Sequence, residues 1–175
     1  MLAQDEDWEP LVRRARRGEP LAVDALVRRL APDVGRICGA IALDGGDDAM
    51  QETFIAVLRG LPGLREPAAM RGWVRRIAVR EAVRVATRAR RTPPVDTDDP
   101  VSPAPSPTPP VDVATALDVR AVLADLTPEH RAILVMRDLG GWSEQEVVAA
   151  LAIAPGTAKS RLSRARAEFQ RRWST

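Results

Sequence analysis

The segment from residue 157 to residue 166 combines positive charge with hydroxyl groups. Its polar side chains include Thr157, Lys159, Ser160, Arg161 and Arg164. Arginine and lysine bind phosphates, and all four residue types also donate hydrogen bonds to the edges of bases. The chemistry that this segment offers is recognition of a nucleic acid.

The same segment carries the pattern of an amphipathic helix. Its apolar residues recur at spacings of four, three and four, and they are Ala158, Leu162, Ala165 and Phe169. This spacing predicts one apolar helix face directed at a core. Pro155-Gly156 breaks the chain just before the segment, so we expect the new helix to begin near Thr157.

Two shorter helices are expected upstream of this one. Thr127 can cap the first helix with its hydroxyl while Pro128 takes the first helical position. Ser143 and Glu146 form a capping box that opens the second helix. The second helix and the basic helix, joined by a tight turn, make a helix-turn-helix, whose second member enters the major groove of DNA. The alternative is an ordinary amphipathic helix with a solvated basic face.

A second concentration of positive charge is expected on a helix from about Met70 to Arg91. Five arginines recur at spacings of four, four, four and three: Arg76, Arg80, Arg84, Arg88 and Arg91. They fall within an arc of roughly 120° on one helix face. Glu81 is the only acid in this segment, so phosphate groups are the natural counter-charge for the stripe. A solvated arginine-rich face is the alternative.

The rest of the N-terminal region is also expected to be helical. The expected helices run from about Trp8 to Arg17, from Pro20 to the low thirties, from Pro32 to Leu43, and from Asp47 or Asp48 to just before Pro62-Gly63. The last of these would bury Met50, Phe54, Val57, Leu58 and Leu61 on one face. Strand signals are weak, because the chain has no Tyr and few aromatic residues. The sequence therefore predicts an all-α fold.

Composition changes abruptly between Thr92 and Asp112. This stretch holds eight of the 15 prolines and four aspartates but no basic residue. Prolines favour extended geometry, so the stretch is expected to be a linker that spans at most on the order of 60 Å. We therefore expect two small helical domains, at 1–91 and 113–175, joined by a Pro-rich linker at 92–112. Residues 1–91 hold 17 basic and 13 acidic side chains, and residues 113–175 hold 9 and 7, so both domains are basic.

Several classes of function are disfavoured by composition. The chain has one cysteine, Cys38, and one histidine, His130, so neither a disulfide nor a usual Cys/His zinc site is expected. No set of residues at catalytic spacing and no glycine-rich phosphate loop is present, so neither an enzyme nor a cofactor is expected. Without a signal peptide or a membrane-spanning apolar run, the expected location is cytoplasmic.

The two halves together resemble a known family. The segments 47–54 (DDAMQETF) and 72–78 (GWVRRIA) resemble region 2 of extracytoplasmic-function (ECF) sigma factors, the smallest members of the sigma-70 family. The segments 126–134 (LTPEHRAIL) and 156–166 (GTAKSRLSRAR) resemble region 4 of the same proteins. The region 4 pattern also occurs in response regulators, and the pairing with the region 2 segment makes the resemblance specific.

The resemblance implies a sigma factor that binds core RNA polymerase and directs it to promoter DNA. It assigns polymerase binding to Asp47, Asp48, Gln51, Glu52 and Phe54. It assigns the minus-ten element to the helix that carries Trp73, Arg76, Arg80, Arg84 and Arg88. The minus-thirty-five element falls to the basic helix with Thr157, Lys159, Ser160, Arg161 and Arg164. An anti-sigma factor is left open as a further partner, and no membrane insertion is implied.

This chain departs from the family pattern at three positions. Arg80 and Arg84 stand where the family often has Asn and Asp, and Ala49 replaces the usual leucine. One hypothesis is that strand capture here relies more on phosphate contacts than on specific hydrogen bonds.

Two other classes of function remain open at this point. A helix-turn-helix regulator that binds an operator without polymerase would bind DNA as the free protein, commonly as a dimer. A protein that sequesters a partner would bind polymerase or an anti-sigma factor without supporting transcription.

Overall fold

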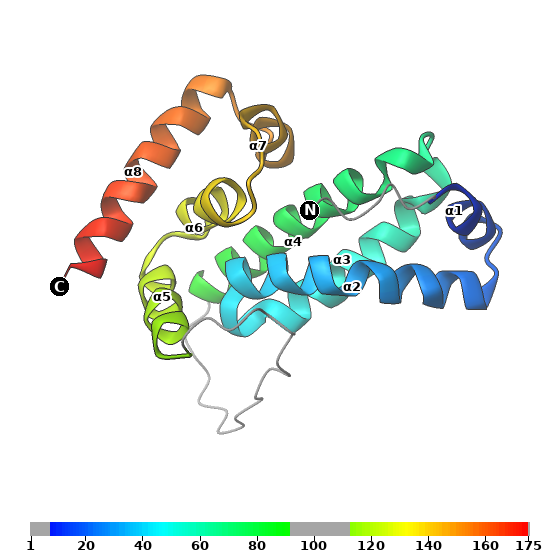
Figure 1. The fold of residues 1–175 in the computed structure, drawn as a ribbon, viewed down its shortest axis with the longest axis horizontal. Helices are drawn as coiled ribbons and strands as arrows, with labels where there is room; N and C mark the ends of the chain where they lie inside the picture. The colour runs from blue at the N-terminus through cyan, green and yellow to red at the C-terminus, as the bar shows by residue number, and fades with distance from the viewer. Residues whose placement is uncertain (1–7, 92–112, 175) are drawn as a thin grey trace.

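The computed structural model describes residues 8–91 and 113–174, whose regular elements are all helical (Figure 1). The N-terminal half, residues 8–91, contains α1 (Glu9–Arg16), α2 (Pro20–Ala42), α3 (Gly46–Gly60) and α4 (Met70–Arg91). The C-terminal half, residues 113–174, contains α5 (Val113–Asp125), α6 (Pro128–Leu134), α7 (Glu144–Leu151) and α8 (Pro155–Trp173). Short turns connect them: η1 (Leu43–Gly45), η2 (Leu61–Gly63), η3 (Pro67–Ala69) and the π-helical η4 (Val135–Leu139). The prediction of an all-α fold is confirmed, and the predicted linker at 92–112 lies outside the described residues.

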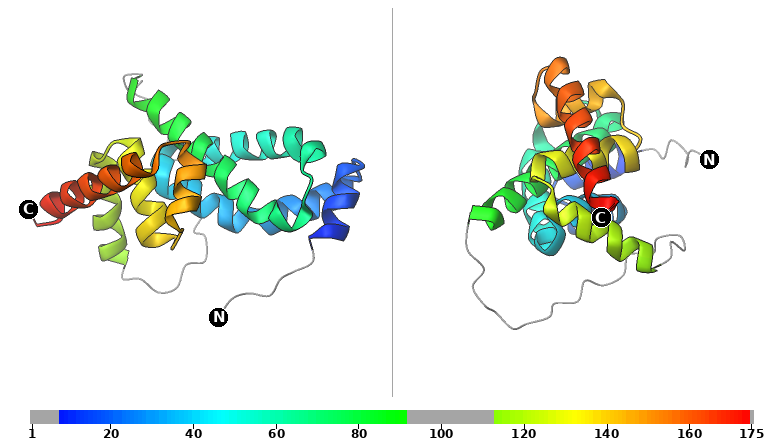
Figure 2. Two further views of the ribbon diagram at one scale, coloured as in Figure 1. Left: turned by 90° about the horizontal axis from the view of Figure 1, so that it is seen from above. Right: turned by 90° about the vertical axis from the view of Figure 1, so that its left-hand side faces the viewer.

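Helices α2, α3 and α4 lie side by side, and α1 crosses the N-terminal end of α2 (Figures 1 and 2). Small residues allow α2 and α3 to approach closely. A Cβ on Gly46 would lie 3.0 Å from the Cα of Gly39, which is too close for a comfortable contact. The bundle therefore depends on glycine where α3 begins.

Helix α2 continues through Pro32, so the expected break at this residue is wrong. An interior proline removes one main-chain hydrogen bond and costs about 3 kcal/mol. The ring of Pro32 is exposed, while the residues on the opposite face form a buried stripe along the whole helix: Leu26, Leu30, Val34, Cys38 and Ile41. Burial of this stripe outweighs the local cost, since one fully buried aliphatic side chain contributes about 1.5–3 kcal/mol.

The buried face of α3 also differs from the expected one. Ala49, Thr53 and Val57 are buried, whereas Leu58 is 38% exposed. The hydroxyl of Thr53 donates a 2.6 Å hydrogen bond to the carbonyl of Ala49, which satisfies this polar group within the core. Small side chains at 49 and 53 let α3 pack closely on its neighbours, and this turns Leu58 toward solvent.

The C-terminal half confirms the expected caps. Thr127 Oγ1 accepts a 3.2 Å hydrogen bond from the amide of His130, and Ser143 and Glu146 form a reciprocal capping box. Helix α8 begins at Pro155, two residues before the expected start, because proline is favoured at the first helical position. Ala158 and Ala165 are buried and Leu162 and Phe169 are half-buried, as the apolar spacing predicted.

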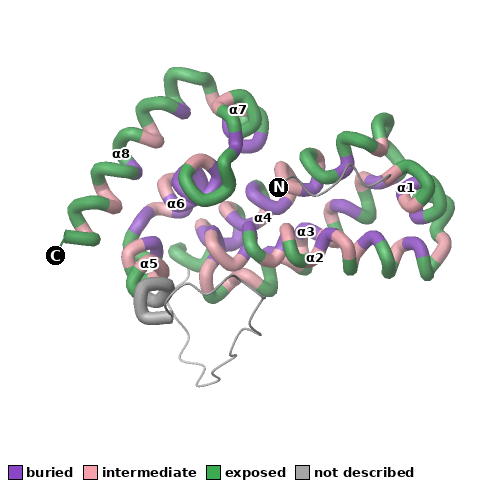
Figure 3. Tube along the Cα trace, viewed as in Figure 1, coloured by how far each residue is buried: buried purple, intermediate pink, exposed green. Residues whose placement is uncertain are grey.

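The two halves pack against each other and share one hydrophobic core (Figure 3). Helices α6 and α7 contact α4, and α6 also contacts α2. Helix α8 lies on the outside of this arrangement, with most of its surface exposed (Figures 1 and 3). Within the described residues, no helix is both long enough and apolar enough to cross a bilayer.

Candidate nucleic-acid interface

The first turns of α8 present the basic cluster to solvent. Thr157, Lys159, Ser160 and Arg164 are exposed, and Arg161 is half-buried. Arg164 donates 3.2 and 3.3 Å hydrogen bonds to the carbonyl and hydroxyl of Ser160, so these two groups are held together on one face. The side chain of Arg161 has no hydrogen bond or ion pair with the described residues. The structure therefore brings the predicted base-reading residues together at one exposed helix end.

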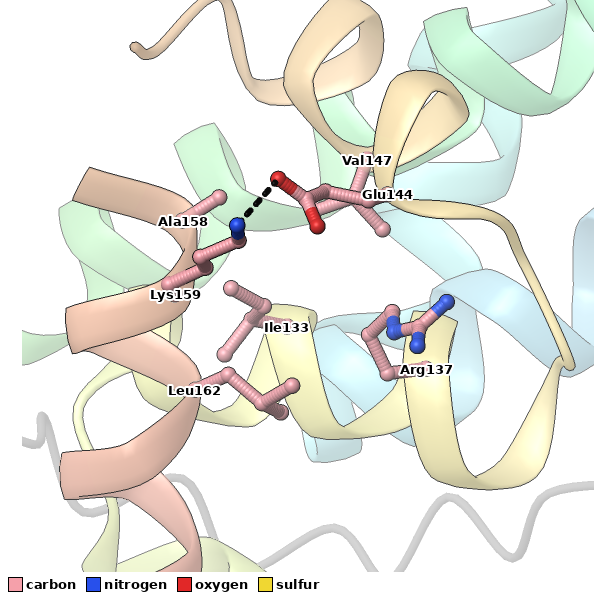
Figure 4. Close-up of a pocket in the computed structure, with 7 residues that line it drawn as sticks. All are labelled: Ile133, Arg137, Glu144, Val147, Ala158, Lys159 and Leu162. Carbon is pink, nitrogen blue, oxygen red and sulfur yellow. Dashed lines mark ion pairs between the residues drawn. The ribbon is translucent and has the colours of Figure 1, made fainter. Parts of the chain in front are cut away.

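The cations of α8 differ in how readily they can bind a phosphate, because some are held in ion pairs within the chain. Arg166 is held by a two-pronged ion pair with Asp138, whose oxygens lie 3.1 and 2.5 Å from its guanidinium. Lys159 lies 3.8 Å from Glu144 at the rim of a shallow hollow between α6, α7 and α8 (Figure 4). The floor of this hollow is apolar and includes Ile133, Val147 and Leu162. The long Lys159–Glu144 contact is exposed and contributes little to stability, so the lysine can exchange it for a phosphate.

The arginine stripe on α4 is less uniform than the sequence suggested. Arg80 donates hydrogen bonds to the carbonyls of Ala150 and Ala149, at 3.1 and 3.2 Å, in the last turn of α7. Arg84 pairs with Glu81 at 2.6 Å and with Glu52 at 3.2 Å. These bonds to Glu81 raise the pKa of Arg84. Part of the stripe is thus occupied by partners within the chain.

The remaining predicted residues of α4 differ in exposure. Arg76 is half-buried and its side chain makes no hydrogen bond or ion pair with the described residues, while Arg88 is exposed. Trp73 is half-buried and packs against Gly60, where a Cβ would lie 2.8 Å from its Cζ2 atom. Trp73 therefore packs at the junction of α3 and α4.

The outer face of α3 carries the residues expected to contact polymerase. Asp47, Asp48 and Gln51 are exposed, and Glu52 and Phe54 are half-buried. Two further apolar side chains reach the surface on this helix, Ile55 at 36% and Leu58 at 38% exposure. Sequence reasoning missed both, because it placed Leu58 in the core and gave Ile55 no role. Ile55 follows Gln51 by four residues and Leu58 follows Ile55 by three, and this spacing is the signal that could have shown one shared face.

Arg131 is a buried residue between the two halves that sequence reasoning also missed. It is 4% exposed, and its guanidinium donates a 2.7 Å hydrogen bond to the carbonyl of Ile41 in the other half. Two more bonds reach the carbonyls of Ala124 and Leu126, whereas the Nε atom has no partner. Burial, together with the nearby Arg90 and Arg120, lowers the pKa of Arg131 to about 10. The group remains charged at neutral pH, as a buried cation with no carboxylate hydrogen bond.

A cation–π contact adds to this interface between the halves. The guanidinium of Arg75 lies 4.3 Å from the centre of the buried Trp142 ring. Burial lowers the pKa of Arg75 as well. Neither residue was singled out as a partner from the sequence, because the contact joins α4 to the turn before α7.

Both halves of the chain match models of known families. Residues 26–92 match Sigma-70 region 2, and residues 116–169 match Sigma-70, region 4. The chain is 33% identical over 156 residues to the ECF RNA polymerase sigma factor SigM of Mycobacterium tuberculosis, covering 88% of this chain and 78% of SigM. This chain belongs to the ECF sigma factors. The sequence-based identification of the family is confirmed.

Other ECF sigma factors show the same relationship. The chain is 35% identical over 157 residues to SigE of Mycolicibacterium smegmatis, covering 84% of this chain and 60% of SigE. It is 32% identical over 158 residues to the RNA polymerase sigma factor CarQ of Myxococcus xanthus, covering 86% and 88% of the two chains.

Solved sigma-factor structures share the fold. CnrH, in complex with the cytosolic domain of CnrY, superposes with a TM-score of 0.62 at 22% identity, covering 94% of this chain and 96% of CnrH. RpoE from Bartonella quintana, in complex with the anti-sigma factor NepR, gives a TM-score of 0.60 at 19% identity, covering 87% and 96%. The ECF sigma factor described here therefore has the all-α fold of these proteins.

As a member of this family, the chain is a sigma factor that directs RNA polymerase to promoters. This conclusion disfavours the alternative of a helix-turn-helix regulator that acts without polymerase, because such a regulator has no need of region 2. No cluster of residues suited to a metal ion occurs in the described part of the chain.

Proposed function

We propose that α8 reads the minus-thirty-five element, that α4 contacts the minus-ten element, and that the outer face of α3 binds core RNA polymerase. The observation that carries this division is the presence of regions 2 and 4 in one chain, each with its own exposed basic or mixed surface. Each module alone would bind weakly, and joining them raises their effective concentration on a promoter. We take residues 1–91 and 113–175 as the two functional domains and 92–112 as their tether.

Three features of α8 support its role as the reading helix. Its N-terminal turns are exposed, the guanidinium of Arg164 bonds to Ser160 and to no carboxylate among the described residues, and the Arg161 side chain has no hydrogen bond or ion pair with them. In a helix-turn-helix, side chains at this end of the second helix reach base edges. Arg161 and Arg164 are therefore the strongest candidates for base contacts.

The α3 surface fits a protein partner rather than DNA. Acidic Asp47 and Asp48 would be repelled by phosphates, whereas exposed Ile55 and Leu58 offer apolar area to a partner. We include both apolar residues with Gln51 in the polymerase-binding surface. In this proposal the protein acts by binding alone, without a catalytic site or cofactor, in the cytoplasm where polymerase and DNA meet. An anti-sigma factor is a further proposed partner, in keeping with the complexes of CnrH and RpoE.

The test is transcription by sigma-free core RNA polymerase on a genomic promoter library. The wild-type chain should produce transcripts from defined start sites, and Arg161→Ala should weaken initiation by about 1–3 kcal/mol at promoters whose base it contacts. Arg65→Ala, which removes the same charge from an exposed site on the opposite half, is the matched control. Polymerase binding without initiation would favour a sequestering protein and contradict the proposal.

A further inference from the structure

Three arginines donate hydrogen bonds to main-chain carbonyls of the opposite half, and each acceptor lies at the end of a helix. Arg80 of α4 binds the last turn of α7, and Arg131 of α6 binds Ile41 in the last turn of α2. Arg90 of α4 lies 3.4 Å from the carbonyl of Leu126, just after α5 ends. Arg80 and Arg90 donate from the N-terminal half to the C-terminal half, and Arg131 donates in the opposite direction.

Helix C-termini suit such donors. The last four carbonyls of a helix have no partner within it, and this end of the helix carries partial negative charge. At the end of α7 the amides of Ala152 and Ile153 both bond to the carbonyl of Val148, while Arg80 takes the carbonyls of Ala149 and Ala150. Arg80 therefore completes the cap of a helix that belongs to the other half.

These contacts are weaker than the ones that DNA could offer. A carbonyl carries only a partial charge, whereas a phosphate oxygen carries a full one and makes shorter, stronger bonds to guanidinium. Only one cross-half ion pair with a carboxylate occurs among the described residues, between Arg120 and Asp44 at 2.8 Å, and Asp44 is fully exposed. An anionic ligand can thus replace the polar contacts of the exposed side chains of Arg80 and Arg90, which add to the hydrophobic core that the halves share.

The closed arrangement occupies Arg80 on one proposed DNA surface and leaves the other surface without a polar contact from the described part of the opposite half. Helix α7 lies against α4 (Figures 1 and 2). The guanidinium of Arg75 lies 4.3 Å from the centre of the Trp142 ring, and Arg80 donates to the α7 carbonyls. Helix α8 stays exposed on the outside. Access to the two surfaces therefore differs in the free chain.

We propose that the arginines at 80, 90 and 131 hold the free protein closed, and that Arg80 exchanges the α7 carbonyls for a DNA phosphate when the halves separate. The first part stands on the contacts alone, while the exchange rests on the proposed role of α4 at the minus-ten element. In this proposal Arg131 holds the two halves together and does not contact DNA. Arg80 binds the α7 carbonyls in the closed state and a DNA phosphate in the bound state.

Small-angle X-ray scattering of the full chain tests the closed state without polymerase or DNA. The compact chain should have a radius of gyration of about 16 Å, and the double variant Arg80→Gln/Arg131→Met should rise above about 20 Å as the tethered halves separate. Arg76→Gln removes the same charge one turn earlier on α4, from a residue without a bond across the interface, and should stay compact. Equal compactness of the double variant and the control would overturn the proposal.

Folding of the variants is checked by helix content and melting in circular dichroism. Arg131 also bonds to Ala124 and Leu126 within its own half. If Arg131→Met loses helix content, the variant Arg80→Gln/Arg90→Gln replaces it in the scattering experiment, because both of these arginines are exposed.

Binding of a single-stranded oligonucleotide with the minus-ten sequence of a promoter mapped with the wild-type protein tests the exchange. Arg131→Met should bind this oligonucleotide several-fold more tightly than the wild type, because a larger fraction of the chain is open. Arg80→Gln should open the chain yet bind no more tightly, because it loses the phosphate contact. A decrease for Arg131→Met in a folded protein would contradict the exchange. Failure of the proposed function would instead appear as wild-type protein that supports no transcription, with the scattering result unchanged.

Discussion

Gly60 and Trp73 form a close contact at which only glycine fits. A Cβ at Gly60, the last residue of α3, would lie 2.8 Å from Cζ2 and 3.3 Å from the Cη2 atom of the Trp73 ring on α4. The ring is thereby held at the junction of the two helices whose outer faces we assign to polymerase and to DNA. The orientation of these faces relative to each other depends on this contact.

Gly60→Ala should therefore destabilise the protein by about 1–3 kcal/mol, because the ring must shift in a packed region. Gly72→Ala is the matched control, since a Cβ there has no atom within 4 Å. The control should gain about 0.5–1 kcal/mol from the better helix former. Urea unfolding measures both, and equal stabilisation by the two substitutions would show that Trp73 can move freely.

Pro32→Ala should stabilise the protein. The substitution restores an amide inside α2 at an exposed position, with a gain of about 1–3 kcal/mol after the greater freedom of the unfolded chain is included. Thermal unfolding followed by circular dichroism measures the change. A loss of stability would mean that the helix needs the local geometry that proline imposes.

The thiol of Cys38 should resist alkylation in the folded protein. Burial raises the pKa of Cys38 from 9.0 to about 11, and its sulfur lies 3.7 Å from Thr53 Oγ1. At about pH 8 the thiolate fraction should be about 100-fold below that of an ordinary cysteine. Iodoacetamide should thus react only at the rate of unfolding, and rapid reaction in native buffer would contradict the buried position.

The same pKa shift has a consequence for stability at high pH. The folded-state pKa of Cys38 lies above the unfolded value, so its contribution to stability is complete below pH 9.0 and is lost as pH rises toward about 11. Cys38→Ala should show a smaller loss of unfolding free energy over this range than the wild type.

Stability at low pH should depend on His130 and Glu168. His130 Nδ1 lies 2.7 Å from Glu168 Oε2, and this hydrogen bond, with the nearby Arg172, lowers the pKa of Glu168. Because the folded pKa is lowered, the stabilisation is present above the ordinary carboxyl pKa of 4.5 and is lost as pH falls through the lower folded value. Urea unfolding between about pH 7 and pH 3 should show a shallower pH dependence for His130→Ala; an unchanged slope would remove this pair as the cause.

The α3 surface can be tested apart from folding. Leu58→Glu should weaken binding to core polymerase about tenfold or more while leaving the free energy of unfolding nearly unchanged, since Leu58 is already 38% exposed. Leu21→Glu is the control, because Leu21 is 79% exposed on α2 and lies outside the proposed surface. Equal binding by both variants would exclude Leu58 from the contact.

Local signals in the sequence predicted the local structure well. The caps at Thr127 and Ser143 were found because each depends on residues three positions apart. The expected break at Pro32 failed because burial along the entire helix outweighed a local cost that the sequence displays plainly. Short-range rules identify a helix end, but not the tertiary packing that can override it.

Spacing and resemblance identified the basic and acidic site residues, but they did not identify the residues that these side chains contact within the chain. Arg80 was expected on DNA, and its present contacts with the α7 carbonyls join residues about seventy positions apart in the chain. Arg131 shows no sequence signal at all, since an arginine in an amphipathic helix is normally exposed. Contacts of this kind follow only from how the two halves pack.

Arg80, Arg90 and Arg131 bind the main-chain carbonyls, and not the side chains, of Ile41, Leu126, Ala149 and Ala150. Each acceptor would persist after almost any substitution that leaves the helix end intact. Related proteins can therefore keep this interface while the residue types at the acceptor positions change. Correlated substitutions between the arginines and their acceptors would not reveal these contacts.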